Sequence, residues 1–131
     1  MTVLDASIVV AVLLKTPGFE RIKSRLGHGE QDFHAPHLLD VEVIHVVRRF
    51  WLASEIDDLR AQEAIADLTS FPIRRHPHTP FASRVWELRH NMTAYDALYV
   101  ALSEGLNATL LTCDKRLAEQ AGKYITVETF D

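Results

Sequence analysis

The segment from Thr93 to Leu117 constrains the fold of this chain most, because it places an apolar strand between two helices. Thr93 and Asp96 have the spacing of a capping box, which predicts that a helix begins there. After a turn, the apolar run that starts at Ala108 predicts a buried strand, and Asp114 follows it just before a second helix. This alternation is typical of α/β proteins, which bind ligands at the carboxyl ends of their strands. The segment therefore predicts an α/β fold with a site near Asp96 and Asp114.

Short strands alternate with helices through the rest of the chain. The other expected strands are residues 2–5, 32–36, 71–76 and 124–127. The other expected helices are residues 7–15, 19–26 and 37–53. Two more helices are expected further along, one capped by Ser54 and one capped by Thr79 with Pro80 in its first turn. Such alternation predicts a parallel sheet that is covered by helices on both faces. We therefore expect residues 1–131 to form a single α/β domain.

The composition narrows the class of protein. A chain of 131 residues, of which 47% are hydrophobic, is long enough to bury a core. The net charge of −4 argues against a general nucleic-acid coat, but it allows a basic rim around an acidic site. The single cysteine, Cys113, cannot form an internal disulfide and indicates a reducing compartment. The apolar run from Ile8 to Leu14 is too short to span a membrane, so we expect a cytoplasmic protein.

Four acidic residues are notable for their positions in this pattern. Asp5 ends the first strand and Asp114 follows a later one, although each can also simply cap the helix that comes next. The same alternative holds for Asp96, which is three residues from Thr93. Glu42 lies on a mostly apolar helix, where an acid has few favourable surroundings. It can still face solvent, and the neighbouring Asp40 is a weaker candidate for the same role.

These acids have a common chemical interpretation if folding brings them together. Several carboxylates in one small volume repel one another, so at least one pKa is raised unless a cation is present. Magnesium takes oxygen ligands and is typically bound by a few carboxylates and a substrate phosphate, and manganese suits the same ligands. Such a site can activate a water molecule for attack on a phosphate. Sequence spacing permits this convergence without demonstrating it.

Two segments of the chain resemble a known family when they are taken together. Residues 93–102, TAYDALYVAL, followed by residues 111–117, LTCDKRL, resemble the C-terminal half of PIN-domain ribonucleases, above all the VapC-type toxins of type II toxin–antitoxin modules. Residues 3–7, VLDAS, resemble the family's first strand, and residues 36–43, PHLLDVEV, resemble its glutamate-bearing segment. The resemblance extends from the first expected strand to the last.

The resemblance carries a set of expectations. It implies a PIN-like three-layer α/β/α sandwich with a central, mainly parallel sheet of four to five strands. It implies an endoribonuclease, the toxin of a VapBC-type module, that uses Mg²⁺ or Mn²⁺ and a metal-activated water to hydrolyse RNA phosphodiester bonds. It assigns catalysis and metal binding to Asp5, Glu42, Asp96 and Asp114, with support from Ser7 and Thr112. The implied partners are an RNA substrate, with transfer RNA as one candidate, a cognate antitoxin and a second copy in a homodimer.

Basic and aromatic residues near the acids have two interpretations. Arg89, Lys115 and Arg116 can contact RNA phosphates, or they can be ordinary solvated charges; we assign a supporting role to Arg116. The runs Arg48-Arg49 and Arg74-Arg75-His76 can extend a basic track, but we expect them to form solvated faces. Tyr95 and Tyr99 can stack on bases, but packing in the core or in an interface is the default for such residues.

Other functions fit the sequence less well. The histidines do not have the spacing of a zinc site, and no glycine-rich phosphate loop is present. The remaining alternative is a non-catalytic α/β binding module whose acidic residues are only helix caps. A specific divalent-cation site distinguishes the nuclease from that alternative.

Overall fold

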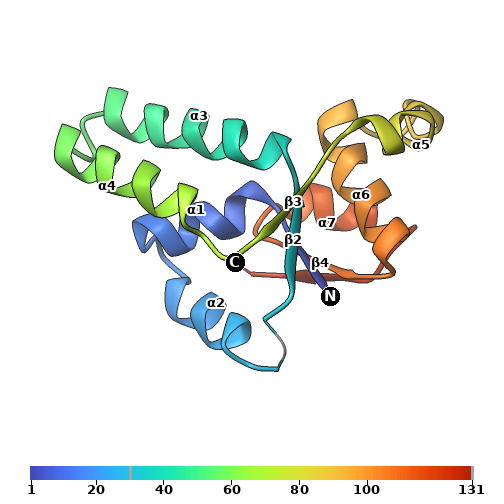
Figure 1. Ribbon diagram of the computed structural model, residues 1–131, viewed down its shortest axis with the longest axis horizontal. Coiled ribbons are helices and arrows are strands. Elements are labelled where there is room, and N and C mark those ends of the chain that lie inside the picture. The colour runs from blue at the N-terminus through green and yellow to red at the C-terminus, as the bar shows by residue number, and fades with distance from the viewer. Residues whose placement is uncertain (30, 131) are drawn as a thin grey trace.

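A five-stranded parallel sheet forms the centre of the fold (Figure 1). The computed structural model describes residues 1–29 and 31–130. The strands are β1 (Thr2–Leu4), β2 (Phe33–Pro36), β3 (Arg74–His76), β4 (Thr109–Thr112) and β5 (Val127–Thr129). They lie in the order β3-β2-β1-β4-β5, and each neighbouring pair is parallel. The expected parallel sheet is therefore confirmed.

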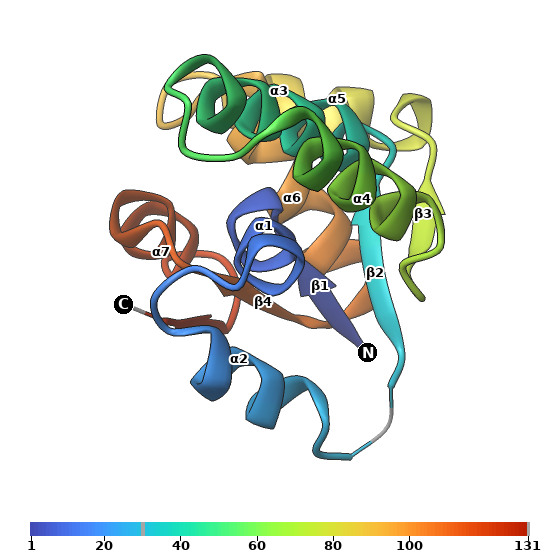
Figure 2. The same cartoon turned by 90° about the vertical axis from the view of Figure 1, so that its left-hand side faces the viewer.

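Helices lie on both sides of this sheet. They are α1 (Ala6–Leu14), α2 (Phe19–Leu26), α3 (Leu38–Leu52), α4 (Asp58–Thr69), the 3-10 helix η1 (Thr79–Phe81), α5 (Ala82–Glu87), α6 (Ala94–Leu106) and α7 (Lys115–Ala121). Figure 1 shows α1 to α4 on one side of the strands and α5 and α6 on the other, and Figure 2 places α1 in front of the sheet and α6 behind it. The strand order explains this three-layer arrangement, because crossovers between parallel strands are right-handed as a rule. Helices on the way from β1 out to β3 then cover one face of the sheet, and helices on the return to β4 cover the other.

The core lies between the central strands and the helices on each face. Val3 and Leu4 of β1 and Leu110 and Leu111 of β4 are all completely buried, as expected for strands covered on both faces. Most of α1 is buried as well, which agrees with its continuous apolar sequence. Across the part of the chain that the structure describes, no helix is both long enough and apolar enough to cross a bilayer.

The order of the strands fixes where a ligand can bind. From β1 the chain turns to β2 on one side, whereas β4 lies against β1 on its other side, so the direction of connection reverses between β1 and β4. Open α/β sheets bind ligands in the crevice at such a reversal, at the carboxyl ends of the strands. Asp5 follows β1 directly, and its N–H donates to the carbonyl of Leu111 at 3.2 Å. This part of the sheet is therefore the natural place for a site.

Two of the expected helix caps are wrong. Ser54 has a φ of +58° in the turn after α3, and the cap of α4 is Asp57, whose side chain accepts from the N–H of Arg60. Thr79 lies inside η1, a tight turn that Phe81 closes onto His78 with a 2.9 Å backbone bond, and α5 begins only at Ala82 without a side-chain cap. In contrast, the cap expected at Thr93 is confirmed, because its hydroxyl accepts from the N–H of Asp96.

The last strand lies later in the chain than the sequence pattern predicts. The N–H groups of Tyr124 and Ile125 both donate to the carbonyl of Ala121, so these residues continue the turn that ends α7. Pairing with β4 begins where Val127 aligns with Leu110. The strand therefore occupies Val127–Thr129 rather than residues 124–127.

Candidate active site

Asp5 is the most deeply buried acid of the candidate site. It caps α1, with Oδ1 accepting from the N–H of Ile8 at 3.3 Å, and only 6% of the residue is exposed. Burial raises the pKa of Asp5 from 3.8 to about 6, even though its hydrogen bonds oppose this shift. The capping interpretation is therefore correct, but it is incomplete, because a simple surface cap has no reason to hold an acid in this environment.

Two hydroxyl groups hold the Asp5 carboxylate in one orientation. Ser7 donates to Oδ1 and Thr112 donates to Oδ2, each at 2.5 Å. The same hydroxyls also accept hydrogen bonds from the segment after β4. The backbone N–H of Cys113 donates to the Ser7 hydroxyl at 2.8 Å, and that of Asp114 donates to the Thr112 hydroxyl at 3.0 Å. Each hydroxyl therefore links the end of β1 to the end of β4 through Asp5.

Glu42 approaches this centre from α3. The hydroxyl of Tyr99 on α6 donates to Oε1 of Glu42 at 2.6 Å. The pKa of Glu42 is raised, first by burial and also by the negative charge of Asp96. The pKa of the Tyr99 phenol is raised as well, by burial and by Glu42, Asp5 and Asp96. The expectation that Glu42 serves the site rather than the solvent is consistent with these contacts.

Asp96 and Asp114 form the outer part of the site. Burial is the main cause of the raised pKa of Asp96, and the charge of Asp114 adds to it. Arg116 opposes this shift with a guanidinium nitrogen 3.9 Å from Oδ2 of Asp96. Asp114 caps α7, because its Oδ1 accepts from the N–H groups of Arg116 at 2.9 Å and Leu117 at 3.1 Å.

The four predicted acids are linked by their charges, each one to the next in the chain. Glu42 raises the pKa of Asp5, Asp96 raises that of Glu42, and Asp114 raises that of Asp96. The donors are carboxylate oxygens with nearby hydroxyls, which is the chemistry that a hard divalent cation prefers. As the side chains stand, no three His, Cys, Asp or Glu residues within residues 1–29 and 31–130 are placed to hold one ion.

The structure adds Tyr99 to the candidate site, although packing was the default expectation for this residue. Tyr99 is 2% exposed, so the packing expectation is correct, but its hydroxyl makes a specific bond to a candidate ligand. It lies three residues after Asp96, on the same side of α6. That spacing is the signal in the sequence that indicates a shared surface.

One basic residue that was expected to be solvated has a structural role instead. Arg75 binds Asp40 on α3 with Nε at 3.0 Å from Oδ1 and 2.8 Å from Oδ2, and it donates to the carbonyl of Leu68 at 2.8 Å. It therefore ties β3 to α3 and to the end of α4. Because Asp40 is engaged in this way, Glu42 is the acid that α3 offers to the site.

The chain is similar to a known protein family and to several named relatives. The PIN domain family matches residues 2–123. The chain is 41% identical to ribonuclease VapC12 of Mycobacterium tuberculosis over 98% of both chains. It is 45% identical to ribonuclease VapC1 of the same organism over 92% of this chain and 90% of the relative.

Solved structures show the same fold at lower sequence identity. The crystal structure of M. tuberculosis VapC20, described as a sarcin-ricin loop cleaving toxin, has a TM-score of 0.73 with 15% identity and covers 98% of this chain and 99% of its own. VapBC2 from Rickettsia felis, bound to a promoter DNA fragment, has a TM-score of 0.66 with 15% identity and covers 99% of this chain and 98% of its own. From the matched domain, the identity to its relatives and this fold, we conclude that the chain belongs to the PIN domain family, among the VapC ribonucleases.

Proposed function

We propose that this protein is the toxin of a VapBC-type toxin–antitoxin module and acts as an endoribonuclease. Its relatives are named ribonucleases, and it covers almost their whole length. The observation that carries the proposal is the buried carboxylate of Asp5 at the β1–β4 junction, with Glu42 near enough to raise its pKa. A binding module with scattered helix caps needs neither this burial nor this crowding.

The proposed cofactor is Mg²⁺, with Mn²⁺ as a substitute, held by Asp5, Glu42, Asp96 and Asp114. The oxygen donors support this choice, as do the raised pKa values of Asp5, Glu42 and Asp96, because a bound cation compensates for the burial that mainly raises them and for the repulsion that adds to it. Such an ion, when bound, polarises a phosphate and lowers the pKa of a water molecule.

The chain's own residues position these groups. Ser7 and Thr112 fix both oxygens of Asp5, and Tyr99 fixes one oxygen of Glu42 and leaves the other available. Groups that hold a ligand in one orientation reduce the reorganisation that catalysis requires. We assign a phosphate contact with RNA to Arg116, whose side chain is 72% exposed and approaches Asp96 at 3.9 Å. We assign Lys115, its neighbour, and Arg89 to the same basic rim.

We also propose two protein partners and a cellular location. Several solved structures with this fold are toxin–antitoxin complexes, and an arginine from an antitoxin is a suitable counter-charge for the acidic centre. A second copy of the chain is proposed to cover the exposed apolar stripe on α3, where Val41 is 65% and Ile44 is 45% exposed. The protein is expected in the cytoplasm, where RNA is present and the single cysteine suits the reducing conditions.

The test is cleavage of RNA by the purified protein. We expect it to cut single-stranded RNA or transfer RNA with Mg²⁺ or Mn²⁺, to stop when EDTA is added, and to recover when the cation is restored in excess. Mapping the cut ends in total RNA then identifies the target. Cleavage that continues in EDTA contradicts the metal assignment, and a lack of specific divalent-cation binding together with a lack of cleavage favours the binding-module alternative.

A further inference from the structure

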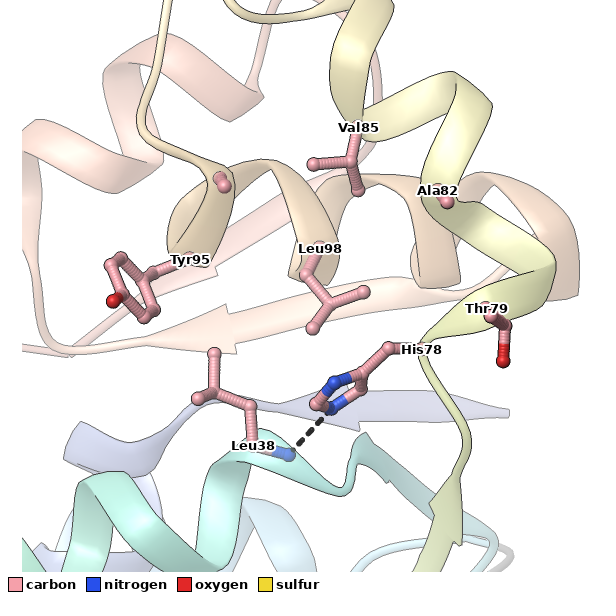
Figure 3. A pocket seen from close by; sticks show the side chains of 8 residues that line it. Leu38, His78, Thr79, Ala82, Val85, Tyr95 and Leu98 are labelled. Carbon is pink, nitrogen blue, oxygen red and sulfur yellow. Dashed lines mark hydrogen bonds between the residues drawn. The ribbon is translucent and has the colours of Figure 1, made fainter.

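An apolar cavity of about 310 Å³ lies beside the acidic centre (Figure 3). It is bounded by the start of α3, by η1 with the start of α5, and by the start of α6. Most of its wall is aliphatic, whereas His78 and Thr79 provide polar groups at one end. A mostly apolar cavity of this size with a few polar groups is typical of a binding site for a small ligand or for part of a larger one.

The cavity shares two of its walls with the candidate active site. Tyr95, which lines the cavity, directly precedes Asp96 on α6. Leu38, which lines the opposite wall, lies one helical turn before Glu42 on α3. A nucleotide whose phosphate lies at the acids can therefore place a neighbouring base at the mouth of this cavity.

The two ends of the cavity suit the two kinds of contact that a base makes. Figure 3 shows Tyr95 at one end, His78 and Thr79 at the other, and Leu38 and Leu98 between them. Tyr95 is 62% exposed, so its ring is available for a base to stack on. The aliphatic residues between the ends can contact the face of the base without making hydrogen bonds.

His78 is held in a defined orientation at the polar end. Its Nε2 accepts from the backbone N–H of Leu38 at 2.9 Å. In a neutral imidazole the other nitrogen, Nδ1, then carries the proton, and it is a donor. The hydroxyl of Thr79 is a second donor on this side. An aliphatic side chain in the cavity would bury these donors without acceptors, whereas every base has acceptors on its edge.

We propose that this cavity binds the base of a nucleotide next to the cleaved bond, with the base stacked on Tyr95 and its acceptor edge toward His78 and Thr79. Because bases differ in where they carry acceptors and amino groups, the donors at this end of the cavity set which base is preferred at that position, whereas Tyr95 holds any base. This inference rests on the ribonuclease function proposed above and adds the residues that determine its sequence preference.

The test compares cleavage-site preference and cleavage rate on a randomised RNA pool. Ala82→Leu fills the cavity from an exposed position of α5, and Tyr95→Ala removes the stacking ring. We expect Ala82→Leu to weaken the preference for one flanking base by about tenfold, and Tyr95→Ala to lower the cleavage rate by about tenfold whichever base is present, because stacking on an aromatic ring stabilises every base. Ser83→Leu, on the next residue of α5, is expected to retain the preference, and Tyr95→Phe, which keeps the ring, is expected to be slowed much less than Tyr95→Ala.

Each result separates this inference from the proposed function. An unchanged preference in Ala82→Leu together with a wild-type rate in Tyr95→Ala overturns the base site and leaves the ribonuclease intact. Wild-type protein that cleaves no RNA with either metal overturns both. If Ala82→Leu instead changes the molecular mass measured by light scattering while its base preference is retained, the cavity belongs to a contact between copies and the base site is wrong.

Discussion

The hydroxyl of Tyr99 donates a 2.6 Å hydrogen bond to Oε1 of Glu42, which is 57 residues earlier in the chain. This bond joins α6 to α3 across the β1–β4 end of the sheet. It holds a carboxylate whose pKa is already raised by burial and by Asp96. This bond can be removed by deleting a single oxygen atom, which leaves the packing of the ring unchanged.

Tyr99→Phe is expected to lower RNA cleavage by about 10- to 100-fold, since groups that orient a metal ligand contribute on that scale. The melting temperature should change little, because the ring remains buried. Initial rates at several Mg²⁺ concentrations measure the effect. Tyr124→Phe is the control, since the Tyr124 hydroxyl contacts Asn91 rather than an acid. Equal rates for wild type and Tyr99→Phe would show that the bond only stabilises the fold.

Asp96→Asn tests the acidic centre with the least disturbance of the fold. The Thr93 hydroxyl caps the helix by accepting from the backbone N–H of Asp96, a bond that the substitution retains. We expect a loss of metal-dependent cleavage of at least about 100-fold and weaker Mg²⁺ binding by calorimetry. Asp67→Asn, an exposed position on α4, is the matched control. Full activity in purified Asp96→Asn protein would remove Asp96 from the site.

The protonation of Asp5 should depend on the cation. In metal-free protein its pKa is raised from 3.8 to about 6, chiefly by burial. The folded chain therefore binds more protons than the unfolded chain between about pH 4 and 6, so this group stabilises the fold as the pH falls from 7 toward 4. Titration followed by ¹³C NMR of the carboxyl carbon should show this pKa in EDTA and a lower one with Mg²⁺.

Two further titrations check the physical cause. Thr112→Val removes a donor that lowers the pKa of Asp5, so the carboxyl should titrate at a higher pH than in the wild type. The Asp67 carboxyl signal should not respond to Mg²⁺, because Asp67 lies on α4 away from the acids. An Asp5 titration midpoint near 4 without metal would contradict the burial argument.

Arg75→Met is expected to lower the free energy of unfolding by about 2 kcal/mol, because hydrogen bonds to charged groups contribute on that scale. It removes the bonds to Asp40 and to the carbonyl of Leu68. Chemical denaturation measures the change. Arg74→Met, at the exposed neighbouring position of β3, should alter stability by less than about 0.5 kcal/mol. Similar values for the two variants would mean that the contacts of Arg75 add little.

The proposed homodimer can be tested on the exposed stripe of α3. Ile44→Asp places a charge on this stripe, while the buried face of the helix, which includes Val43, is unchanged. We expect light scattering to show a dimer for the wild type and a monomer for Ile44→Asp. Glu63→Asp on α4 is a control of similar exposure to solvent. A variant that remains dimeric places the contact elsewhere.

Much of the local structure was predictable because it depends on neighbouring residues. The cap at Thr93 and the ends of α2 follow from contacts within one turn of chain. The errors have the same origin: Ser54 and Thr79 have the right residue types for caps, but the backbone adopts another conformation at each. The role of Arg75 could not be predicted, because its partner Asp40 is 35 residues away.

The sequence by itself determined the α/β alternation, the identity of the acids and their positions after strands or on an apolar helix, since each depends on spacing within a short segment. Only the tertiary structure decided which groups meet. Thr112 reaches Asp5 across 107 residues and Tyr99 reaches Glu42 across 57. The physical reason is that β1 and β4 become neighbours through burial of their apolar side chains, and that register then brings the polar groups at their ends together.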